Sequence, residues 1–367
     1  MTARARVLVL TASVGAGHDV PAQALERGIR ARRPDADVRI VDALDVMGRL
    51  VHHAAEDAMR RTIGGGRLHW VFDAQYLVFA RSPLRRLGQA ALQRSAGPKL
   101  LAEVLRREPD VVVSTYPAAT EVLGRLRRSG RLRVPAVSAV TDLASLHYWA
   151  SRGIDLHLLT HPESRPEVER IAGPGDARAV RGLHDERFLD PPSREEARAA
   201  LGLDPEAPVV AVSGGGWGVG DVPGAVAIAL ERPGTTVLAL CGANERLRAS
   251  LAAAHAGAPV RALPFVDDMP ALLAASDALV HSTAGLTVLE ALLVGCRPIS
   301  YGFGVGHIRA NNRAYRRLGL ARVARDPGEL RLALADALAE PRRPLAAEFA
   351  RLPHAADLVL ELADGRR

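Results

Sequence analysis

Pro208-Val209-Val210-Ala211-Val212-Ser213 runs directly into Gly214-Gly215-Gly216-Trp217-Gly218-Val219-Gly220. The first stretch is a short apolar run, which favours a buried strand, and the second is a glycine cluster ahead of a helical pattern. Glycine lets the backbone turn with positive φ and lets a ligand approach closely. A helix N-terminus behind such a loop offers free N–H groups to an anion. The stretch predicts a phosphate-binding loop, with a plain tight turn as the alternative.

A smaller loop of the same kind, Gly15-Ala16-Gly17-His18, follows the apolar run Val7–Leu10. Further short apolar runs alternate with helical patterns, at 38–41, 111–113, 136–140 and 155–159 in the first half and at 209–212, 237–240, 260–263, 278–281 and 298–301 in the second. Parallel sheets covered on both faces by helices give this pattern. We therefore predict an α/β chain with two Rossmann-like, doubly wound domains that face a cleft, with ligands at the carboxyl ends of the strands.

The pattern divides the 367 residues into four parts. Residues 1–185 form a first domain, and residues 186–205, which contain Pro191-Pro192, form a linker with a short helix. Residues 206–340 form a second domain, and residues 341–367 form a helical tail that either stands alone or packs back on the first domain. Within the first domain we expect Asp19 to cap a helix that begins at Pro21.

The composition bounds the class of protein. The formal net charge is +7, carried almost entirely by arginine, which fits either a compositional bias or attraction to phosphates and acidic lipids. The two cysteines offer neither a disulfide framework nor zinc spacing, so we expect a reducing cytoplasm and no metal. No run of about twenty apolar residues is present to span a bilayer. We expect no nucleic-acid partner.

Aromatic residues are scarce, at 4%, yet they cluster in residues 67–95 beside arginines. An interfacial helix uses this combination to settle among lipid headgroups. The alternative is an amphipathic helix packed on its own domain. The candidate residues for contact with a membrane or an acceptor are Trp70, Phe72, Tyr76, Phe79, Arg85 and Arg86.

Several segments follow strand ends in an order that resembles a known family. They are the glycine run, Cys241-Gly242-Ala243-Asn244, Phe265-Val266-Asp267-Asp268-Met269, Leu286-Thr287-Val288-Leu289-Glu290-Ala291 and Gly306-His307-Ile308-Arg309-Ala310-Asn311. They resemble the GGGxGxG, CGxN, FVxxM, LTVxE and GQEEGN segments of the glycosyltransferases that build monogalactosyl- and diglucosyl-diacylglycerol, and of their relative that makes peptidoglycan lipid II. In the first half, Gly15–His18 resembles the GGGH-type loop and Val140-Thr141-Asp142-Leu143 resembles the VTD segment, with His147 and Trp149 beyond it.

The resemblance implies the GT-B fold, a first domain that binds the acceptor, and a second that binds a UDP-sugar without a metal or other cofactor. Phe265 and Val266 would form a wall for the uracil, or be an ordinary strand end. Glu290 would accept hydrogen bonds from the ribose hydroxyls, or be a plain acid near a helix start. The residues expected to bind the donor are Gly214, Gly215, Gly216, Trp217, Gly242, Asn244, Phe265, Val266, Met269, Ala284, Gly285, Thr287, Glu290, His307 and Asn311. The chain departs from the family at Ser282, where a Lys or Arg is usual, and at His307, Ile308 and Arg309, which replace Gln and both Glu of GQEEGN.

The acceptor hydroxyl of a glycosyl transfer needs a base. His18 is one candidate, because imidazole accepts a proton near neutral pH, and its alternative is a structural loop histidine. Asp142 is the other candidate, either as the base itself or as a group that orients His18.

These features predict an inverting glycosyltransferase that moves a hexose from a UDP-sugar to an acceptor hydroxyl. The acceptor is expected to be a diacylglycerol-type membrane lipid, with the protein peripheral on the inner face of the cell membrane. Three alternatives stay open: transfer to a soluble secondary metabolite, a UDP-sugar epimerase on the same fold, and a binding protein that has lost catalysis, which Ser282 would favour. The sequence names neither the sugar nor the acceptor.

Overall fold

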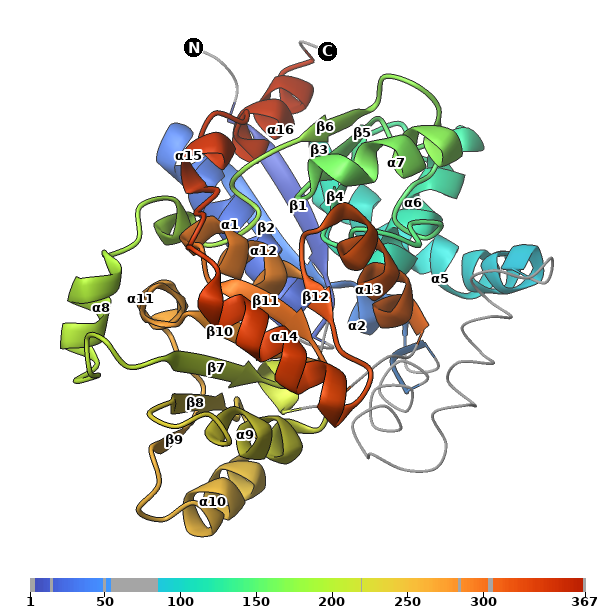
Figure 1. Ribbon diagram of the computed structural model, residues 1–367. Helices are drawn as coiled ribbons and strands as arrows, with labels where there is room; N and C mark the ends of the chain where they lie inside the picture. The colour runs from blue at the N-terminus through green and yellow to red at the C-terminus, as the bar shows by residue number, and fades with distance from the viewer. Residues whose placement is uncertain are drawn as a thin grey trace. The chain divides into compact units, whose positions relative to one another are not determined.

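The computed structural model describes residues 4–13, 16–48, 51–53, 85–218, 220–282, 285–302 and 306–365. It divides into two compact units (Figure 1). The described residues up to 186 and from 351 onward form the first unit, and residues 187–350 form the second. Each unit is built on one six-stranded sheet.

The first unit has the strand order β2-β1-β3-β4-β5-β6, and every neighbouring pair is parallel. The strands are β1 (Arg6–Thr11), β2 (Asp37–Asp42), β3 (Val111–Ser114), β4 (Ala136–Val140), β5 (Leu156–Leu159) and β6 (Ala177–Ala179). The chain places β2 on one side of β1 and then returns to place β3 on the other side. The gap between the carboxyl ends of β1 and β3 is therefore a topological switch point, where open α/β sheets bind their ligands.

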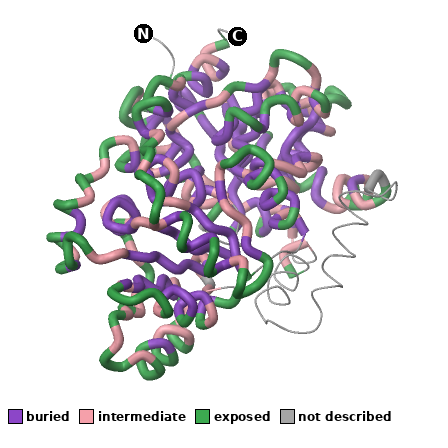
Figure 2. The backbone as a smooth tube through the Cα atoms, viewed as in Figure 1, coloured by how far each residue is buried: buried purple, intermediate pink, exposed green. Residues whose placement is uncertain are grey.

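Helices cover both faces of this sheet because successive residues of a strand point to opposite sides. Val7 and Val9 of β1 pack in one core with residues of α1 (Ala16–Arg32) and of α16 (Ala355–Ala363). Leu8 and Leu10 pack in another with residues of α5 (Arg85–Arg107) and α6 (Pro117–Arg128). Figure 2 shows the strands as mostly buried and the outer helix faces as exposed. The remaining elements of this unit are α2 (Ala43–Met47), the short 3-10 helix η2 (Pro162–Ser164) and α7 (Arg165–Ala172).

The end of the chain returns to the first unit. The Ala355 amide donates to the carbonyl of Arg181 at 2.9 Å, and the Arg181 amide donates to the carbonyl of Pro353 at 3.1 Å. Arg33, the residue after α1, forms a bidentate ion pair with Asp364, the residue after α16, at 2.7 and 2.8 Å. These contacts fix α16 against α1.

The second unit has the strand order β12-β11-β10-β7-β8-β9, again parallel throughout. The strands are β7 (Val209–Ser213), β8 (Thr236–Leu240), β9 (Val260–Leu263), β10 (Ala278–His281), β11 (Arg297–Ser300) and β12 (Arg322–Val323). Its helical segments are η3 (Glu186–Leu189, which begins at the last residue of the first unit), α8 (Arg194–Ala200), η4 (Gly215–Trp217), α9 (Val222–Leu230), α10 (Glu245–Ala254), α11 (Met269–Ala275), α12 (Leu286–Val294), α13 (Gly306–Leu318), α14 (Pro327–Ala339) and α15 (Ala346–Phe349). The switch point of this sheet lies between β7 and β10.

Residues 187–205, which we expected to form a linker, belong to the second unit, and so do residues 341–350 of the expected tail. Arg198 on α8 explains the first of these findings. Its side chain is 1% exposed, pairs with Asp277 at 2.7 Å and donates to the carbonyls of Ala275 and Ala207. A buried guanidinium with a carboxylate and several carbonyl partners is a strong local anchor.

The prediction of an α/β fold with a parallel sheet in each half is confirmed. Two strands were not predicted, β6 and β12, because they have only three and two residues. The expectation that Asp19 caps a helix at Pro21 is wrong. Helix α1 begins at Ala16, so Asp19 lies in its first turn and accepts a hydrogen bond from the Thr11 hydroxyl at 2.8 Å. Among the described residues, no helix is long and apolar enough to cross a membrane.

Candidate functional site

His18 lies at the switch point of the first unit, on the first turn of α1. Its Nδ1 lies 2.9 Å from the carbonyl oxygen of Thr115, the residue that follows β3. A carbonyl oxygen can only accept, so Nδ1 carries the proton and Nε2 is the lone-pair nitrogen of the neutral ring. The ring is edge-on to Tyr116, with centroids 5.3 Å apart, and lies 6.0 Å from the ring of Trp149. The imidazole is therefore held with its tautomer and orientation defined.

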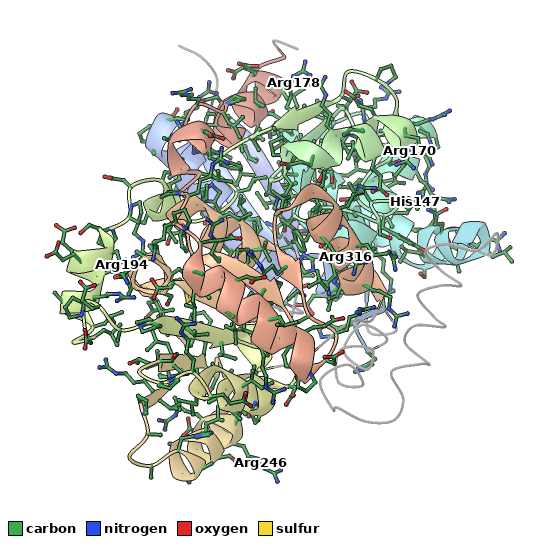
Figure 3. The ribbon with its side chains drawn as sticks, viewed as in Figure 1. His147, Arg170, Arg178, Arg194, Arg246 and Arg316 are labelled. Carbon is green, nitrogen blue, oxygen red and sulfur yellow. The ribbon has the colours of Figure 1, made fainter. Side chains whose placement is uncertain are left out.

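Asp142 follows β4, the next strand along the sheet. Its Oδ2 accepts a hydrogen bond from the indole Nε1 of Trp149 at 2.9 Å. Trp149 is 3% exposed, so this bond lies in a largely water-free setting. Both predicted catalytic residues thus contact the same indole, which brings His18 and Asp142 into one site. His147 belongs to the same loop and is labelled in Figure 3.

Thr115 and Tyr116 were not predicted from the sequence. Thr115 contributes a main-chain carbonyl, which leaves no signature in residue type. Tyr116 packs on His18, and burial together with the Asp42 carboxylate raises the pKa of its phenol to about 12, so the phenol stays protonated at neutral pH. Their position directly after an apolar run was the available signal.

In the second unit the glycine loop follows β7 at the switch point. Its residue Gly220 has φ +92°, and a Cβ added there would lie 2.5 Å from the Cβ of Ser282, which follows β10. A Cβ on Gly242, which follows β8, would lie 2.4 Å from the carbonyl oxygen of Gly216. The Ala243 amide donates to that same oxygen at 2.8 Å. The loops that follow β7, β8 and β10 thus pack so closely that they leave no room for a side chain at Gly220 or Gly242.

Helix starts line the same edge of the second sheet. Asp221 caps α9 by accepting from the Gly224 amide at 2.9 Å. Helix α12 begins just after Gly285, whose amide donates to the Tyr315 hydroxyl at 3.4 Å. Thr287 lies in the first turn of α12, and Glu290, 9% exposed, lies one turn further. This edge can present backbone N–H groups and one nearly buried carboxylate to a ligand.

The segment after β9 carries the expected base-binding residues. Phe265 is 60% exposed although it is aromatic, Val266 is half-buried, and Met269 begins α11. Asn244 has an assigned structural contact, since its Oδ1 caps α10 by accepting from the Leu247 amide at 3.0 Å. Asn244 therefore fixes the start of α10 beside the glycine loop.

Helix α13 carries His307 and Asn311 in its first two turns. Asn311 is fully buried, and its side-chain nitrogen donates to the carbonyl of His307 at 3.0 Å. His307 itself is half-buried. Asn311 therefore fixes the turn on which His307 stands.

Some predicted residues lie outside the part of the chain that the structure describes. They are Ala284 and the aromatic residues Trp70, Phe72, Tyr76 and Phe79. The backbone of Trp217, Arg85 and Arg86 is described, but their side chains are not. Across the described residues, no group of three His, Cys, Asp or Glu side chains could hold a metal ion.

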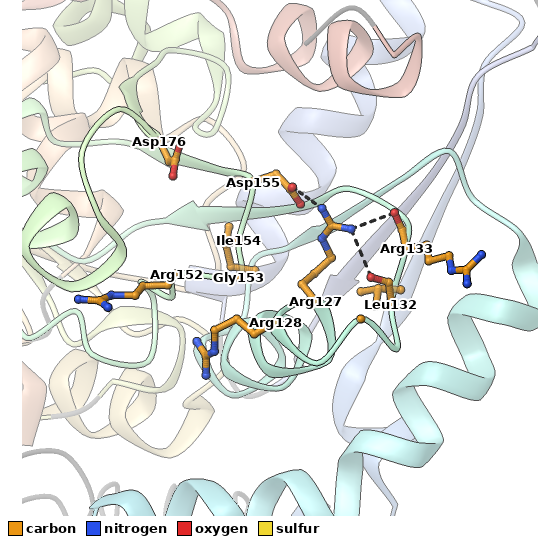
Figure 4. Close-up of a pocket in the computed structure, with 10 residues that line it drawn as sticks. Arg127, Arg128, Leu132, Arg133, Arg152, Gly153, Ile154, Asp155 and Asp176 are labelled. Atoms are coloured by element: carbon orange, nitrogen blue, oxygen red, sulfur yellow. Dashed lines mark hydrogen bonds and ion pairs between the residues drawn. The ribbon is translucent and has the colours of Figure 1, made fainter.

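A separate hollow of about 630 Å³ lies at the opposite edge of the first sheet, beside the amino ends of β4, β5 and β6 (Figure 4). Arg127 spans it, pairing with Asp155 and donating to the carbonyls of Leu132 and Arg133. Arg128 and Arg152 point to one side of the hollow and Arg133 to the other. These arginines do not converge on one point, and the hollow is no part of the site around His18.

Comparison with known proteins gives a consistent picture. A family model described as monogalactosyldiacylglycerol (MGDG) synthase matches residues 18–176, the segment that contains His18, Thr115, Asp142 and Trp149. A probable monogalactosyldiacylglycerol synthase 2 of Oryza sativa subsp. indica is 28% identical over 308 residues, which cover 79% of this chain and 64% of the rice protein. A processive diacylglycerol beta-glucosyltransferase of Staphylococcus epidermidis is 23% identical over 235 residues, or 63% of this chain and 60% of that protein. The matches therefore span less than two thirds of these two relatives.

Two solved structures resemble the whole chain. MurG of Acinetobacter baumannii has a TM-score of 0.57 at 17% identity and covers 97% of this chain and 99% of its own. The spinosyn rhamnosyltransferase SpnG complexed with thymidine diphosphate has a TM-score of 0.59 at 15% identity, with the same coverages. At such identities the likeness shows the fold, which is GT-B. The resemblance to MGDG synthases and diacylglycerol glucosyltransferases, predicted from the motifs, is confirmed.

Proposed function

We propose that this chain is a glycosyltransferase that moves a hexose from a UDP-sugar to the hydroxyl of a diacylglycerol-type lipid. The observation that carries the proposal is the orientation of His18. The Thr115 carbonyl holds the proton on Nδ1, which makes Nε2 the basic nitrogen, and this arrangement lies inside the segment that matches the MGDG synthase model.

The second unit supports a role in donor binding. Its glycine loop packs against the loops that follow β8 and β10, so N–H groups from several segments gather at one edge. Such preorganised donors stabilise the negative charge that grows on a departing nucleoside diphosphate. In this proposal the nearly buried carboxylate of Glu290 accepts hydrogen bonds from the ribose hydroxyls. SpnG, which shares the fold, was solved with thymidine diphosphate.

The chemistry follows from these roles. Nε2 of His18 takes the proton of the acceptor hydroxyl as its oxygen attacks the anomeric carbon of the sugar. The bond between that carbon and the diphosphate oxygen breaks, and UDP leaves with the electron pair. A single displacement inverts the anomeric configuration. Asp142, held by the Trp149 indole that lies by the His18 ring, supplies a negative charge in the site where that ring becomes cationic.

The lipid acceptor rests on the named activities of the relatives, and we propose a peripheral position at the inner face of the membrane because such a lipid lies in a membrane. SpnG, which shares the fold, is instead a spinosyn rhamnosyltransferase. Transfer to a soluble acceptor is therefore the competing hypothesis. The +7 net charge favours the membrane, because an anionic surface attracts a basic protein.

The test incubates the full chain with each of several UDP-hexoses and with vesicles that contain diacylglycerol. We expect UDP release that depends on diacylglycerol and a lipid product heavier by one hexose. Release with soluble hydroxyl compounds but not with diacylglycerol would replace the lipid acceptor. Conversion of a UDP-hexose without acceptor would identify an epimerase, and absence of UDP binding in calorimetry would contradict the donor assignment.

A further inference from the structure

The loop that follows β4, residues 141–149, carries both Asp142 and Trp149 and contains a strained turn. Ser145 has φ 68°, in the left-handed region that favours glycine. A residue with a side chain costs about 1–3 kcal/mol in such a conformation, so the turn persists only where its surroundings hold it. The structure shows what holds it.

Glu167, in the first turn of α7, accepts a hydrogen bond from the Ser145 amide at 3.2 Å and another from the Leu146 amide at 3.1 Å. Each amide uses a different carboxylate oxygen. Successive N–H groups that converge on one anion form a backbone nest, which a left-handed residue makes available. The carboxylate is therefore bound by the strained turn itself.

Ser164, at the end of η2, holds the same loop by binding its main-chain carbonyls instead of its amides. Its hydroxyl lies 3.3 Å from the carbonyl oxygen of Asp142 and 3.2 Å from that of Leu143, so it donates to this pair. One short segment of chain thus satisfies carbonyls on one side of the turn and amides on the other.

The held turn also sets the place of Trp149. The carbonyl of Leu146 accepts from the Trp149 amide at 2.9 Å and from the Ala150 amide at 2.8 Å. A continuous series of contacts then runs from Glu167 through Leu146 to Trp149, whose indole binds Asp142 and lies beside the His18 ring.

We propose that Glu167, assisted by Ser164, is a positioning residue of the active site, which acts by fixing the loop that carries Asp142 and Trp149. The inference rests on the proposed function, because it assumes that His18 and Asp142 carry the chemistry. A competing explanation is that Glu167 only stabilises α7, since an acidic residue suits the first turn of a helix. The two explanations predict different kinetics.

The experiment compares Glu167→Ala and Glu167→Gln with the control Glu163→Gln. Glu163 is an exposed acid on the neighbouring η2, so it matches the change in charge without the loop contact. We expect Glu167→Ala to lower kcat by about 10- to 100-fold, the effect of a misplacement of about 1 Å, with the KM of the UDP-sugar unchanged. Glu167→Gln keeps one acceptor oxygen, so its kcat should lie between those of Glu167→Ala and the wild type. The kcat of Glu163→Gln should match the wild type. A drop in melting temperature without a selective drop in kcat would overturn the proposal.

A rescue variant makes the test specific to the turn. Glycine adopts positive φ at little cost, so adding Ser145→Gly to Glu167→Ala should recover at least several-fold of the lost kcat. Failure of this rescue would overturn the proposal.

Amide hydrogen exchange gives a readout that does not need activity. Glu167→Ala should speed exchange across residues 143–150 and leave β7 unchanged, whereas unaltered exchange in 143–150 would overturn the proposal. If the wild type transfers no sugar although exchange responds as expected, the proposed function fails. Glu167 then holds the loop in place but positions no catalytic group.

Discussion

The two units build their candidate sites at equivalent places in their sheets but from different materials. In the first unit, side chains do the work: an imidazole, a carboxylate and an indole, each fixed by a hydrogen bond or a ring contact. The candidate site of the second unit consists mainly of backbone, because glycines allow three loops to pack closely against one another. Glu290 adds a nearly buried carboxylate to this backbone site.

The difference matches what each half would have to do. Proton transfer needs a titratable atom at one point, so the geometry of a few side chains decides it. Binding a diphosphate needs many N–H groups that are pre-aimed at spread charge, which backbone supplies without losing side-chain entropy. The comparison predicts that first-unit changes alter turnover and second-unit changes alter donor affinity.

The largest effect is expected from His18→Asn. Loss of the basic nitrogen should lower kcat by about 10²- to 10⁴-fold, because that is the usual contribution of a general base. The affinity for UDP, measured by calorimetry, should stay within about twofold of the wild type, since the proposed donor site lies in the other unit. His255→Asn, at the end of α10, serves as the control. A parallel loss of UDP affinity would break the division of labour.

Gly220→Ala is the matching change in the second unit. The new Cβ would meet Ser282 at 2.5 Å, and the residue would keep φ +92°. We expect a loss of about 1–3 kcal/mol in stability and a clear loss of UDP affinity, because the loop must move. Gly257→Ala is the control, since Gly257 also has positive φ, +81°, but nothing within 4 Å. Equal effects of the two variants on UDP binding would show that packing against Ser282 is irrelevant to the donor.

Glu290→Gln tests the carboxylate that we propose binds the ribose hydroxyls. Replacing a nearly buried carboxylate by its amide should weaken UDP binding about tenfold, the value of a hydrogen bond to a charged group. The affinity for 2′,3′-dideoxy-UDP should not change, because that ligand has no hydroxyls for Glu290 to bind. The exposed Glu195 supplies the control Glu195→Gln. If both nucleotides lose affinity equally, Glu290 acts by stabilising α12 and not through the ribose.

The sequence predicted those parts of the site whose signal is local. The glycine loop, His18 and Asp142 each lie in a segment that follows an apolar run. The topology brings the first two to switch points and Asp142 to the end of the neighbouring strand β4. Glu167 carries no such signal, because its partners are amides 22 and 21 residues away, and any acid on a helix surface looks the same. Thr115 acts through a carbonyl that every residue possesses.

Arg198 shows why the linker was assigned differently from the structure. An arginine among charged residues after two prolines reads as solvated surface, yet it is 1% exposed and binds Asp277. Asp277, 79 residues away, and several main-chain carbonyls together make that burial favourable. The error at Asp19 has a local origin, since α1 begins at Ala16, ahead of Asp19, and the carboxylate binds the Thr11 hydroxyl at the end of the preceding strand.

The smallest effect expected is a difference in acid sensitivity between the units. Burial lowers the pKa of His157 to about 4, a shift that the hydrogen bond to the Asp176 carbonyl and the nearby Asp155 only partly offset. Burial likewise lowers the pKa of His161 to about 4 against the opposing charge of Asp142. Both rings stay neutral in the folded first unit.

The histidines of the unfolded chain, with a pKa near 6.5, bind protons between pH 6.5 and 4, where the buried rings of the folded chain do not. Stability is therefore complete above pH 6.5 and falls as the pH drops towards 4, by at most about 1.4 kcal/mol per pH unit for each histidine. Nε2 of His157 accepts from the Ser151 amide, so protonation there would also cost a hydrogen bond.

Hydrogen-exchange protection factors at pH 7.5 and 5.0 should therefore fall more for β5 of the first unit than for β8 of the second. His157→Gln keeps a donor and an acceptor without a titrating ring and should flatten the dependence, whereas His255→Gln should leave it intact. If β5 and β8 lose protection in parallel, acid acts on the chain as a whole, and the buried histidines do not set the first unit apart.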